Sequence, residues 1–485
     1  MHIPDEFHLF RDPSQVEIAA ARAIRIQHYP DEILARIFCH WRDIWRDIWL
    51  AHLVHGIKRS TIHFHLDPPF VLQAVCYRWR EIARHSAPLW ADLFIDCGAR
   101  NHRLNQRLDI ILQRARDYPL TVYIQDIHTG IFGQRWFQDM VMILNPTVTR
   151  WARLTMSFVH PNDVHKFLQV WPLNCVRLRQ ITFYGCVDIT PTNTLPFSFP
   201  PPAAPIRVIR LRNILWWQSR TFAGLREIAI GPSHGNLLTQ SAILSLLGAT
   251  PDIQRLKLLA FEEAEIPVPT HGLPEGFRLP HLRRLAASPI VLRTTLVGFD
   301  SPVILPALAN VSIHFDAQDE NDEEDIVRRR EDLRGVGMFL QRHFTTALKL
   351  RGLDDKYSLE AVTSLVFVPM NCSRIETLHF VECVGHTTDL IEQALRKVPY
   401  SSPVMPSNHS LRGRTLQARG GQPGGSVFLF PHLMTLRLTR CGDVDGAVIE
   451  SALRAGRPHT LHQLELRNSD IDQDQYNRII ALLGH

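Results

Sequence analysis

An apolar triplet recurs along most of the chain, and it constrains the fold more than any other feature of the sequence. The triplet has the spacing apolar-x-x-apolar-x-apolar, and in most cases it returns after about 26 to 30 residues. The alternation at its end is that of a strand with one buried face. One such strand cannot bury its apolar side alone, so the period predicts units that stack on one another. The middle residues of the triplets are Leu154, Ile181, Ile209, Ile228, Leu256, Leu285, Val311, Leu348, Leu378, Leu436 and Leu464.

The period is typical of leucine-rich repeats, whose units are about 20 to 29 residues long. Three triplets have a cysteine three residues after their last apolar site: Cys186, Cys383 and Cys441. Such repeats use a small residue there to turn off the strand. We therefore predict an α/β fold, a curved solenoid with parallel strands over residues 96–485. Helical sequences lie between the triplets at 239–249, 389–398, 445–456 and 474–484, and an insertion rich in Pro, Gly and Ser, predicted to be disordered, lies at about 399–426.

The N-terminal part of the chain has helical periodicity instead. Residues 1–28 form a leader with one short helical sequence, and Pro30 then opens a stretch typical of a helix start. Two short amphipathic helices are predicted, separated by an insertion at 41–68 that contains a tandem WRDI. Neither helix can bury its stripe alone. The apolar stripes are Ile33, Leu34, Ile37 and Phe38 in the first helix, and Val71, Leu72, Val75, Trp79, Ile82 and Ala83 in the second.

The composition fits a folded protein with little charge bias. Hydrophobic residues make up 45% of the 485 residues and charged residues 21%, and the formal net charge is +5. The eight cysteines include no CxxC pair, so we expect reduced thiols. The chain lacks a signal-peptide pattern and an apolar run long enough to span a membrane. We therefore expect a soluble protein of the cytoplasm, the nucleus or both, with neither membrane nor nucleic acid as a partner.

Three segments occur in the order found in the F-box, a three-helix module. They are PDEILARIF, AVCYRWREIA and PLWADL, and together they span residues 29–95, which resemble an F-box domain. Similar proteins with irregular leucine-rich repeats bind the Skp adaptor of an SCF-type cullin–RING ubiquitin ligase and select its substrate. The resemblance implies that the adaptor-binding residues are Pro30, Ile33, Leu34, Ile37, Phe38, Val71, Val75, Cys76, Trp79 and Trp90. It leaves open which of these contact the adaptor and which form the core of the module.

Three segments look like chemical sites, but their sequence context does not support one. Gly231–Gly235 matches G-x-S-x-G, yet it follows one strand of a repeated series, and Pro232 restricts the turn. His63 and His65 have no cysteine pair or carboxylate at ligand spacing. Gly420–Gly425 lacks the Lys-Ser/Thr of a phosphate-binding loop. We expect no catalytic residue, no metal and no cofactor.

Basic residues are concentrated on one face of the predicted strands. The positions that alternate with the triplet hold ten basic residues against Glu227 and Glu465. Such a face attracts an acidic or phosphorylated protein substrate. Two alternatives remain: the charges keep an exposed sheet soluble, or the acidic stretch Asp316–Asp325 covers the face. The predicted substrate-binding residues are Arg153, Arg210, Arg212, Arg255, Lys257, Arg284, Lys349 and Arg351, and Arg437 and Arg467 complete the ten.

These patterns predict a non-catalytic substrate-recognition subunit of an SCF-type ubiquitin ligase. The F-box would bind the Skp adaptor, and the repeats would hold the target. The alternative is a leucine-rich-repeat scaffold unconnected to ubiquitin transfer. An enzyme is a third hypothesis, and no coherent set of catalytic residues supports it.

Overall fold

The chain forms two compact units in the computed structural model. The first consists of Met1–Ile189 and Phe197–Ile206, and the second of Thr190–Pro196 and Arg207–His485. The structure describes residues 28–55, 68–97, 104–159, 175–185, 205–212, 224–231, 247–259, 278–297, 303–315, 323–399, 426–442, 444–467 and 471–483, together with a few isolated residues between these ranges.

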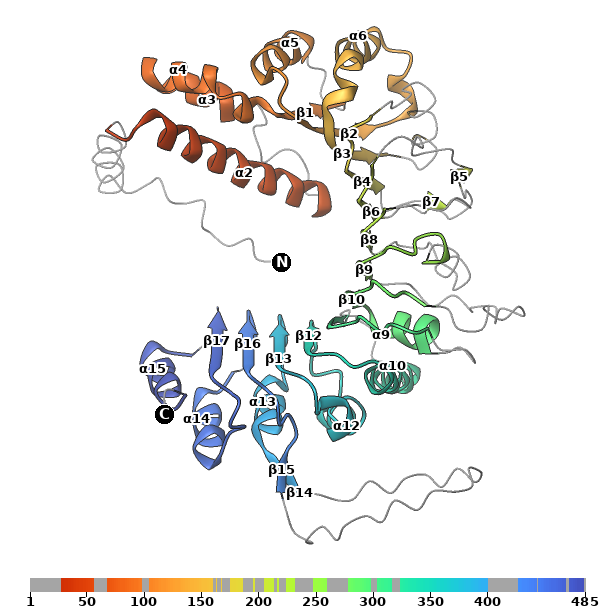
Figure 1. Cartoon of the computed structure of the whole chain (residues 1–485), viewed down its shortest axis with the longest axis vertical. Helices are drawn as coiled ribbons and strands as arrows, with labels where there is room; N and C mark the ends of the chain where they lie inside the picture. Colours follow the sequence, from red (N-terminus) through yellow and green to blue (C-terminus); the bar gives the residue numbers. More distant parts are fainter. Residues whose placement is uncertain are drawn as a thin grey trace. The chain divides into compact units, whose positions relative to one another are not determined.

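The first unit combines a group of helices with four parallel strands in the order β1-β2-β3-β4 (Figure 1). Leu93 and Ile95 of the first strand are fully buried, as are Val122 and Ile124 of the second. The strands are β1 (Asp92–Asp96), β2 (Leu120–Ile127), β3 (Trp151–Phe158) and β4 (Gln180–Gly185). The main helices are α2 (Asp31–His55), α3 (Pro68–Val75), α4 (Tyr77–His85), α5 (Leu104–Ala115) and α6 (Arg135–Leu144), with a 3-10 turn η3 (Ala87–Trp90) before β1.

Helix α2 is much longer than the short helix that the sequence predicted. It continues through the tandem WRDI to His55, so most of the predicted insertion at 41–68 is helix. The predicted insertion was wrong because the charged residues of the tandem WRDI suggested a loop. In the structure its two arginines instead approach a buried carboxylate. Arg42 and Arg46 reach the buried carboxylate of Asp92, with Nε of Arg42 at 3.3 Å and Nη1 of Arg46 at 3.6 Å from Oδ2.

Aromatic packing joins the second half of α2 to the first strands of the sheet. Trp45 and Trp49 lie against Phe94 of β1, with ring centroids 4.6 and 5.1 Å apart. Trp49 also contacts Tyr123 of β2 at 5.3 Å. Strand β1 begins at Asp92, so the sheet starts inside the segment predicted as the F-box, and the predicted boundary at residue 95 falls within a strand.

Among the described residues, the second unit contributes nine parallel strands to the main sheet, which with the four above make thirteen. Their order is β6-β8-β9-β10-β11-β12-β13-β16-β17, so strands that follow one another along the chain lie side by side. The strands are β6 (Val208–Arg212), β8 (Glu227–Ile230), β9 (Arg255–Leu258), β10 (Arg284–Ala287), β11 (Asn310–His314), β12 (Ala347–Arg351), β13 (Thr377–Val381), β16 (Thr435–Thr439) and β17 (Gln463–Arg467).

The predicted triplets form these strands in register. Ile228 is paired with Leu256, Leu256 with Leu285, and Leu285 with Val311, so each triplet stacks on the next. The triplet residues from Trp151 to Leu464 are all buried, including the polar Thr345 at 2% exposure. Leu466, on the last strand of the sheet, is the one triplet residue that is half-buried.

Helices follow the strands of the second unit, mostly where the sequence predicted them. The helices α13 (Thr387–Leu395), α14 (Gly446–Ala455) and α15 (Gln473–Ala481) match predicted segments, whereas 239–249 lies almost entirely outside the described residues. Part of the charged run after β11 is a helix that was not predicted, α10 (Glu323–Arg342), and its Asp332 pairs with Arg293 at 3.1 Å. Other short helical elements among the described residues of the unit are α9 (Pro289–Val291), η6 (Leu292–Val297), α11 (Leu359–Ala361), η7 (Val362–Val366) and α12 (Pro369–Cys372).

A two-stranded hairpin closes the insertion after α13. Strands β14 (Lys397–Pro399) and β15 (Ser426–Phe428) pair antiparallel, so the two ends of the predicted insertion meet, while residues 400–425 lie outside the described part of the chain. The seven described cysteines form no disulfide with one another. No described helix combines the length and apolar character needed to cross a membrane.

Candidate binding surfaces

A row of apolar side chains runs along α2 and faces solvent. Each of its members keeps between 38% and 47% of its surface exposed. At about 100° per residue, the members inside the helix fall within a sector of about 80°. Soluble proteins rarely expose a contiguous apolar row of this kind unless a partner covers it. We call this row the α2 stripe, and its members are Tyr29, Ile33, Ile37, Trp41, Ile44 and Ile48.

The α2 stripe lies beside the stripe by which the helix packs into its own unit. Leu34 and Phe38 are at most 1% exposed, and the Phe38 ring lies 4.8 Å from the ring of Trp79. Helices α3 and α4 add two exposed apolar side chains at their junction, Val75 at 55% and Tyr77 at 74%. The helix therefore has a structural face beside an apolar face that stays largely exposed in the described part of the chain.

The ten residues assigned to the adaptor by the F-box resemblance divide in the same way. Leu34, Phe38 and Trp90 belong to the core, where the indole N–H of Trp90 donates to the carbonyl of Ala83 at 2.6 Å. Cys76 caps α4, since its Sγ accepts from the backbone N–H of Trp79 at 3.4 Å. Val71 and Trp79 are half-buried. The exposed members are Pro30, Ile33, Ile37 and Val75.

Hydrogen bonds fix the beginning of α2 relative to α4. Arg78 of α4 donates through Nη2 to the carbonyl of Tyr29 and to Oδ1 of Asp31, both at 2.6 Å. The carbonyl of Pro30 accepts from the backbone N–H of Ile33 and Leu34, at 3.0 and 3.1 Å. These contacts hold the first turn of the α2 stripe in one orientation.

The predicted substrate-binding residues do not all lie together. Arg153 is on β3 of the first unit, whereas the other seven lie in the second unit. Burial, and then the charge of Asp92, raises the pKa of Tyr123, and the positive charges of Arg46 and Arg153 oppose this rise. Arg153 therefore lies near the α2 contact. The seven predicted substrate-binding residues of the second unit are on β6 (Arg210, Arg212), β9 (Arg255, Lys257), β10 (Arg284) and β12 (Lys349, Arg351).

Acidic side chains neutralise much of the predicted basic face. Glu227 lies 2.7 Å from Nη2 of Arg210 and 3.6 Å from Nη1 of Arg255, so one carboxylate serves two arginines. At the other end of the unit, Glu465 pairs with Arg437 at 3.1 Å. The same carboxylate lies 3.3 Å from Arg467.

Sequence reasoning missed one acid that faces these strands. Glu382 follows the last residue of β13 with a left-handed φ of 54°, a conformation that pattern analysis does not anticipate outside glycine. Its carboxylate accepts two bonds from Arg351, at 2.8 and 2.7 Å, and lies 3.4 Å from Arg440. The count of face charges from strand positions alone was therefore too positive.

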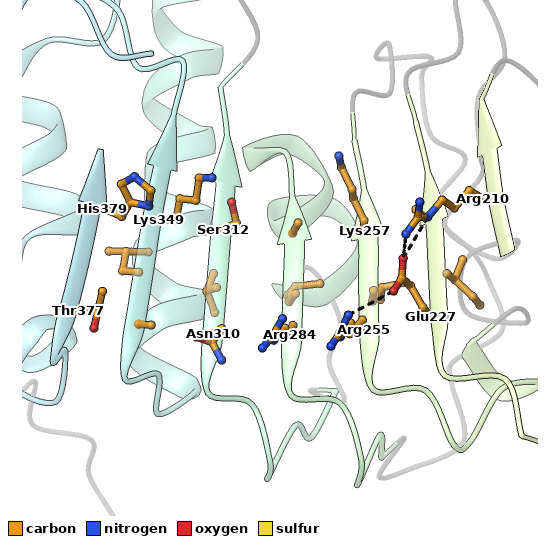
Figure 2. A pocket seen from close by; sticks show the side chains of 18 of the residues that line it. Arg210, Glu227, Arg255, Lys257, Arg284, Asn310, Ser312, Lys349, Thr377 and His379 are labelled. Carbon is orange, nitrogen blue, oxygen red and sulfur yellow. Dashed lines mark hydrogen bonds and ion pairs between the residues drawn. The ribbon is translucent and has the colours of Figure 1, made fainter. Parts of the chain in front are cut away.

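A groove of about 650 Å³ lies on the strand face of the second unit (Figure 2). Its lining comes from eight successive strands, β6 to β16 in the sheet order, and includes Lys257, Arg284 and Lys349. Within the described part of the chain, these three cations have no ion pair, unlike Arg210 and Arg255. Among the described residues, the positive charge without an ion pair is thus centred on β9 to β12, whereas Arg210 and Arg255 share the carboxylate of Glu227.

Small side chains form the floor of the groove between the two lysines. In register along the strands, Lys257 is followed by Ala286, Ser312 and Lys349. Oγ of Ser312 lies 3.1 Å from Nε2 of His314. Burial first, and then the charges of Lys257, Arg351 and Lys349, lowers the pKa of His314 to about 3, so this ring is neutral at physiological pH.

The lysines show the same crowding of positive charge. Burial lowers the pKa of Lys257, and the charges of Arg351, Arg210 and Lys349 lower it further. The pKa of Lys349 is lowered by burial and by Arg351, with Glu382 opposing the shift. A bound anion would relieve this repulsion.

The other sequence candidates for chemistry gain no support. Ser233 and the histidine pair at 63 and 65 lie outside the described residues. Among the residues that are described, no three His, Cys, Asp or Glu side chains gather so as to hold a metal ion. Neither a scan against models of known protein families nor a search of curated proteins finds a match to this chain.

Proposed function

We propose that this chain is the substrate-recognition subunit of an SCF-type ubiquitin ligase. The α2 stripe docks on a Skp-type adaptor, and the strand array, a leucine-rich-repeat solenoid, holds the protein target. The observation that carries the proposal is the α2 stripe, because an ordered helix exposes a row of apolar side chains next to its own core face.

The arrangement of the N-terminal helices supports the same proposal. Short helices α3 and α4 pack on α2, and their exposed Val75 and Tyr77 enlarge the apolar surface. An interface of this type gains its free energy from burying apolar side chains in a preformed surface. A scaffold unconnected to ubiquitin transfer has no need of an apolar surface on this module, so adaptor binding separates the two hypotheses.

The test is co-purification of the full-length chain with a Skp-type adaptor. Ile33→Asp/Ile37→Asp places two carboxylates on the α2 stripe, and we expect at least about 30-fold weaker adaptor binding, since hot-spot losses are about 2 kcal/mol or more. Leu34→Asp is not a suitable variant, because Leu34 is fully buried and its replacement would unfold the module.

Ile326→Asp is the matched control. Ile326 is an isoleucine of α10 in the second unit and is 61% exposed, so the same chemical change is made away from α2. We expect this control to bind the adaptor as the unmodified chain does. Equal binding by the stripe variant and the control, or no binding by any folded form of the chain, would show that the proposed function is wrong.

A further inference from the structure

The groove in the second unit has the features of a site for one concentrated negative charge. Lys257, Arg284 and Lys349 line it without an ion pair among the described residues, while the cations toward both ends have carboxylate partners. Lys257 and Lys349 are half-buried, so their charges are screened less than those of fully exposed side chains. A cation that merely keeps a sheet soluble has no reason to be half-buried and crowded by other cations.

The spacing of the strands allows these cations to act on one group. Lys257 and Lys349 are three strands apart, which is about 14 Å at about 4.8 Å per strand. Ala286 and Ser312 between them are small, and both lysines have long flexible stems that can turn toward the space above them. Arg284 and Asn310 are paired with each other on β10 and β11, two residues before Ala286 and Ser312 on the same strands (Figure 2).

The number of donors favours phosphate over carboxylate. Two ammonium groups, one guanidinium and the Ser312 hydroxyl line the middle of the groove. A phosphate monoester offers three acceptor oxygens and a charge of about −2 at neutral pH, whereas a carboxylate offers two oxygens and a single charge. His314 is neutral and hydrogen-bonds to Ser312, so it adds polarity without a further positive charge.

The length of the groove favours a peptide over a small phosphorylated molecule. Its lining spans eight strands, or about 34 Å at the usual strand spacing. An extended segment of about ten residues has the same length. Polar and small residues such as Asn310 and Thr377 occur along the groove and can bond to a peptide backbone.

We propose that the groove binds an extended peptide that carries one phosphate group, held by Lys257, Arg284 and Lys349 above Ala286 and Ser312. The proposal rests on the proposed function, because this peptide is the part of the target that the ligase subunit recognises. It assigns the recognition of the target to three residues near the middle of the second unit.

The experiment probes the full-length chain, without adaptor, on arrays of degenerate ten-residue peptides. The central position is phosphoserine, serine or glutamate in three otherwise identical arrays. We expect the phosphoserine array to bind at least about tenfold more strongly than either other array, since hydrogen bonds to a doubly charged phosphate are stronger than those to a hydroxyl or a carboxylate. The variant Lys257→Gln/Arg284→Gln/Lys349→Gln is expected to lose this preference.

Arg226→Gln/Arg283→Gln/Arg396→Gln is the control for loss of charge. All three arginines are exposed and lie in the second unit, and none lines the groove. We expect this control to bind phosphoserine peptides within about twofold of the unmodified chain, a change within the range of surface substitutions. Thermal melts of both triple variants establish that they are folded.

Equal binding of the phosphoserine array and either the serine or the glutamate array would overturn the proposal. So would unchanged phosphoserine binding by the Lys257→Gln/Arg284→Gln/Lys349→Gln variant, or no peptide binding by the folded chain. Binding of inorganic phosphate without any peptide preference would assign the groove to a small molecule instead. The readout involves no adaptor, so failure here and failure of adaptor docking are distinguishable.

Discussion

Three histidines in the second unit are held in environments that oppose their protonation. Burial and neighbouring cations lower the pKa of His314 to about 3, and burial together with Arg342 lowers that of His343 to about 4. Burial, Lys349 and Arg437 lower the pKa of His379 to about 4, with Glu465 opposing the shift. A histidine in an unfolded chain has a pKa of about 6.5.

This difference predicts how stability depends on pH. Between about pH 6.5 and pH 4 the unfolded chain binds more protons than the folded chain, so the free energy of unfolding falls as the pH falls. Above about pH 7 the histidines contribute no slope. Melting temperatures measured from pH 7.5 to 4.5 should therefore decrease toward acid, and His314→Asn should make that decrease shallower.

His432→Asn serves as the comparison for the histidine prediction. His432 is exposed and lies outside the strands, so its replacement should leave the slope of melting temperature against pH unchanged. An identical slope for His314→Asn and for the unmodified chain would contradict the assignment of the acid sensitivity to these three histidines.

At the scale of single elements, the triplets could be predicted from the sequence, but helix α2 could not. The triplets have a fixed spacing, and all of their buried residues except Thr345 are apolar. In α2, the buried face of the second half includes Arg42 and Arg46, which appear polar in the sequence and become structural only through the distant Asp92. Pairing across about 50 residues of chain is not a local pattern.

Strands β1 and β2 were missed for a different reason. In β2 most residues are buried on both faces, so it lacks the alternation of the later strands. Its outward Tyr123 is covered because α2 packs there, with the Tyr123 ring stacked on Phe94 at 4.7 Å. A strand covered on both sides reads as a continuous apolar run, which periodicity alone does not separate from a buried helix.

The hairpin at the insertion yields a prediction for an element. Because β14 and β15 already pair, their ends are close enough for a short connection. Replacing residues 400–425 with a four-residue Gly/Ser linker should change the melting temperature by less than about 4 °C, the shift expected for about 1 kcal/mol in a unit of this size. Differential scanning calorimetry measures this change. A decrease of 10 °C or more would show that the segment packs on the second unit.

At the scale of the whole molecule, the sequence predicted a single basic face, and the structure divides it. Arg153 belongs to the unit that contains α2. Glu227 and Glu465, which the sequence already set against the basic residues, pair with Arg210 and Arg437, and Glu382, which it did not count, pairs with Arg351. Residue order identifies which side chains share a face, because strands alternate. It does not identify which of them form ion pairs, since those depend on rotamers and on turns such as the one at Glu382.

The adaptor residues illustrate the same limit. A family pattern assigned both Leu34 and Ile37 to the adaptor, but one turn of helix separates a core residue from an exposed one. The members Trp41, Ile44 and Ile48 of the α2 stripe continue the same spacing. The sequence did not predict these three as part of an apolar row, because the predicted helix ended before Trp41.

Calorimetric titration of the full-length chain with a purified Skp-type adaptor tests the central claim most directly. We predict a one-to-one complex with a Kd below about 1 μM and a negative heat-capacity change, the signature of apolar burial. Ile33→Asp/Ile37→Asp should remove the heat of binding, and Ile326→Asp should retain it. No binding by the folded, unmodified chain at about 50 μM, where a Kd of that order would be detected, would contradict the account.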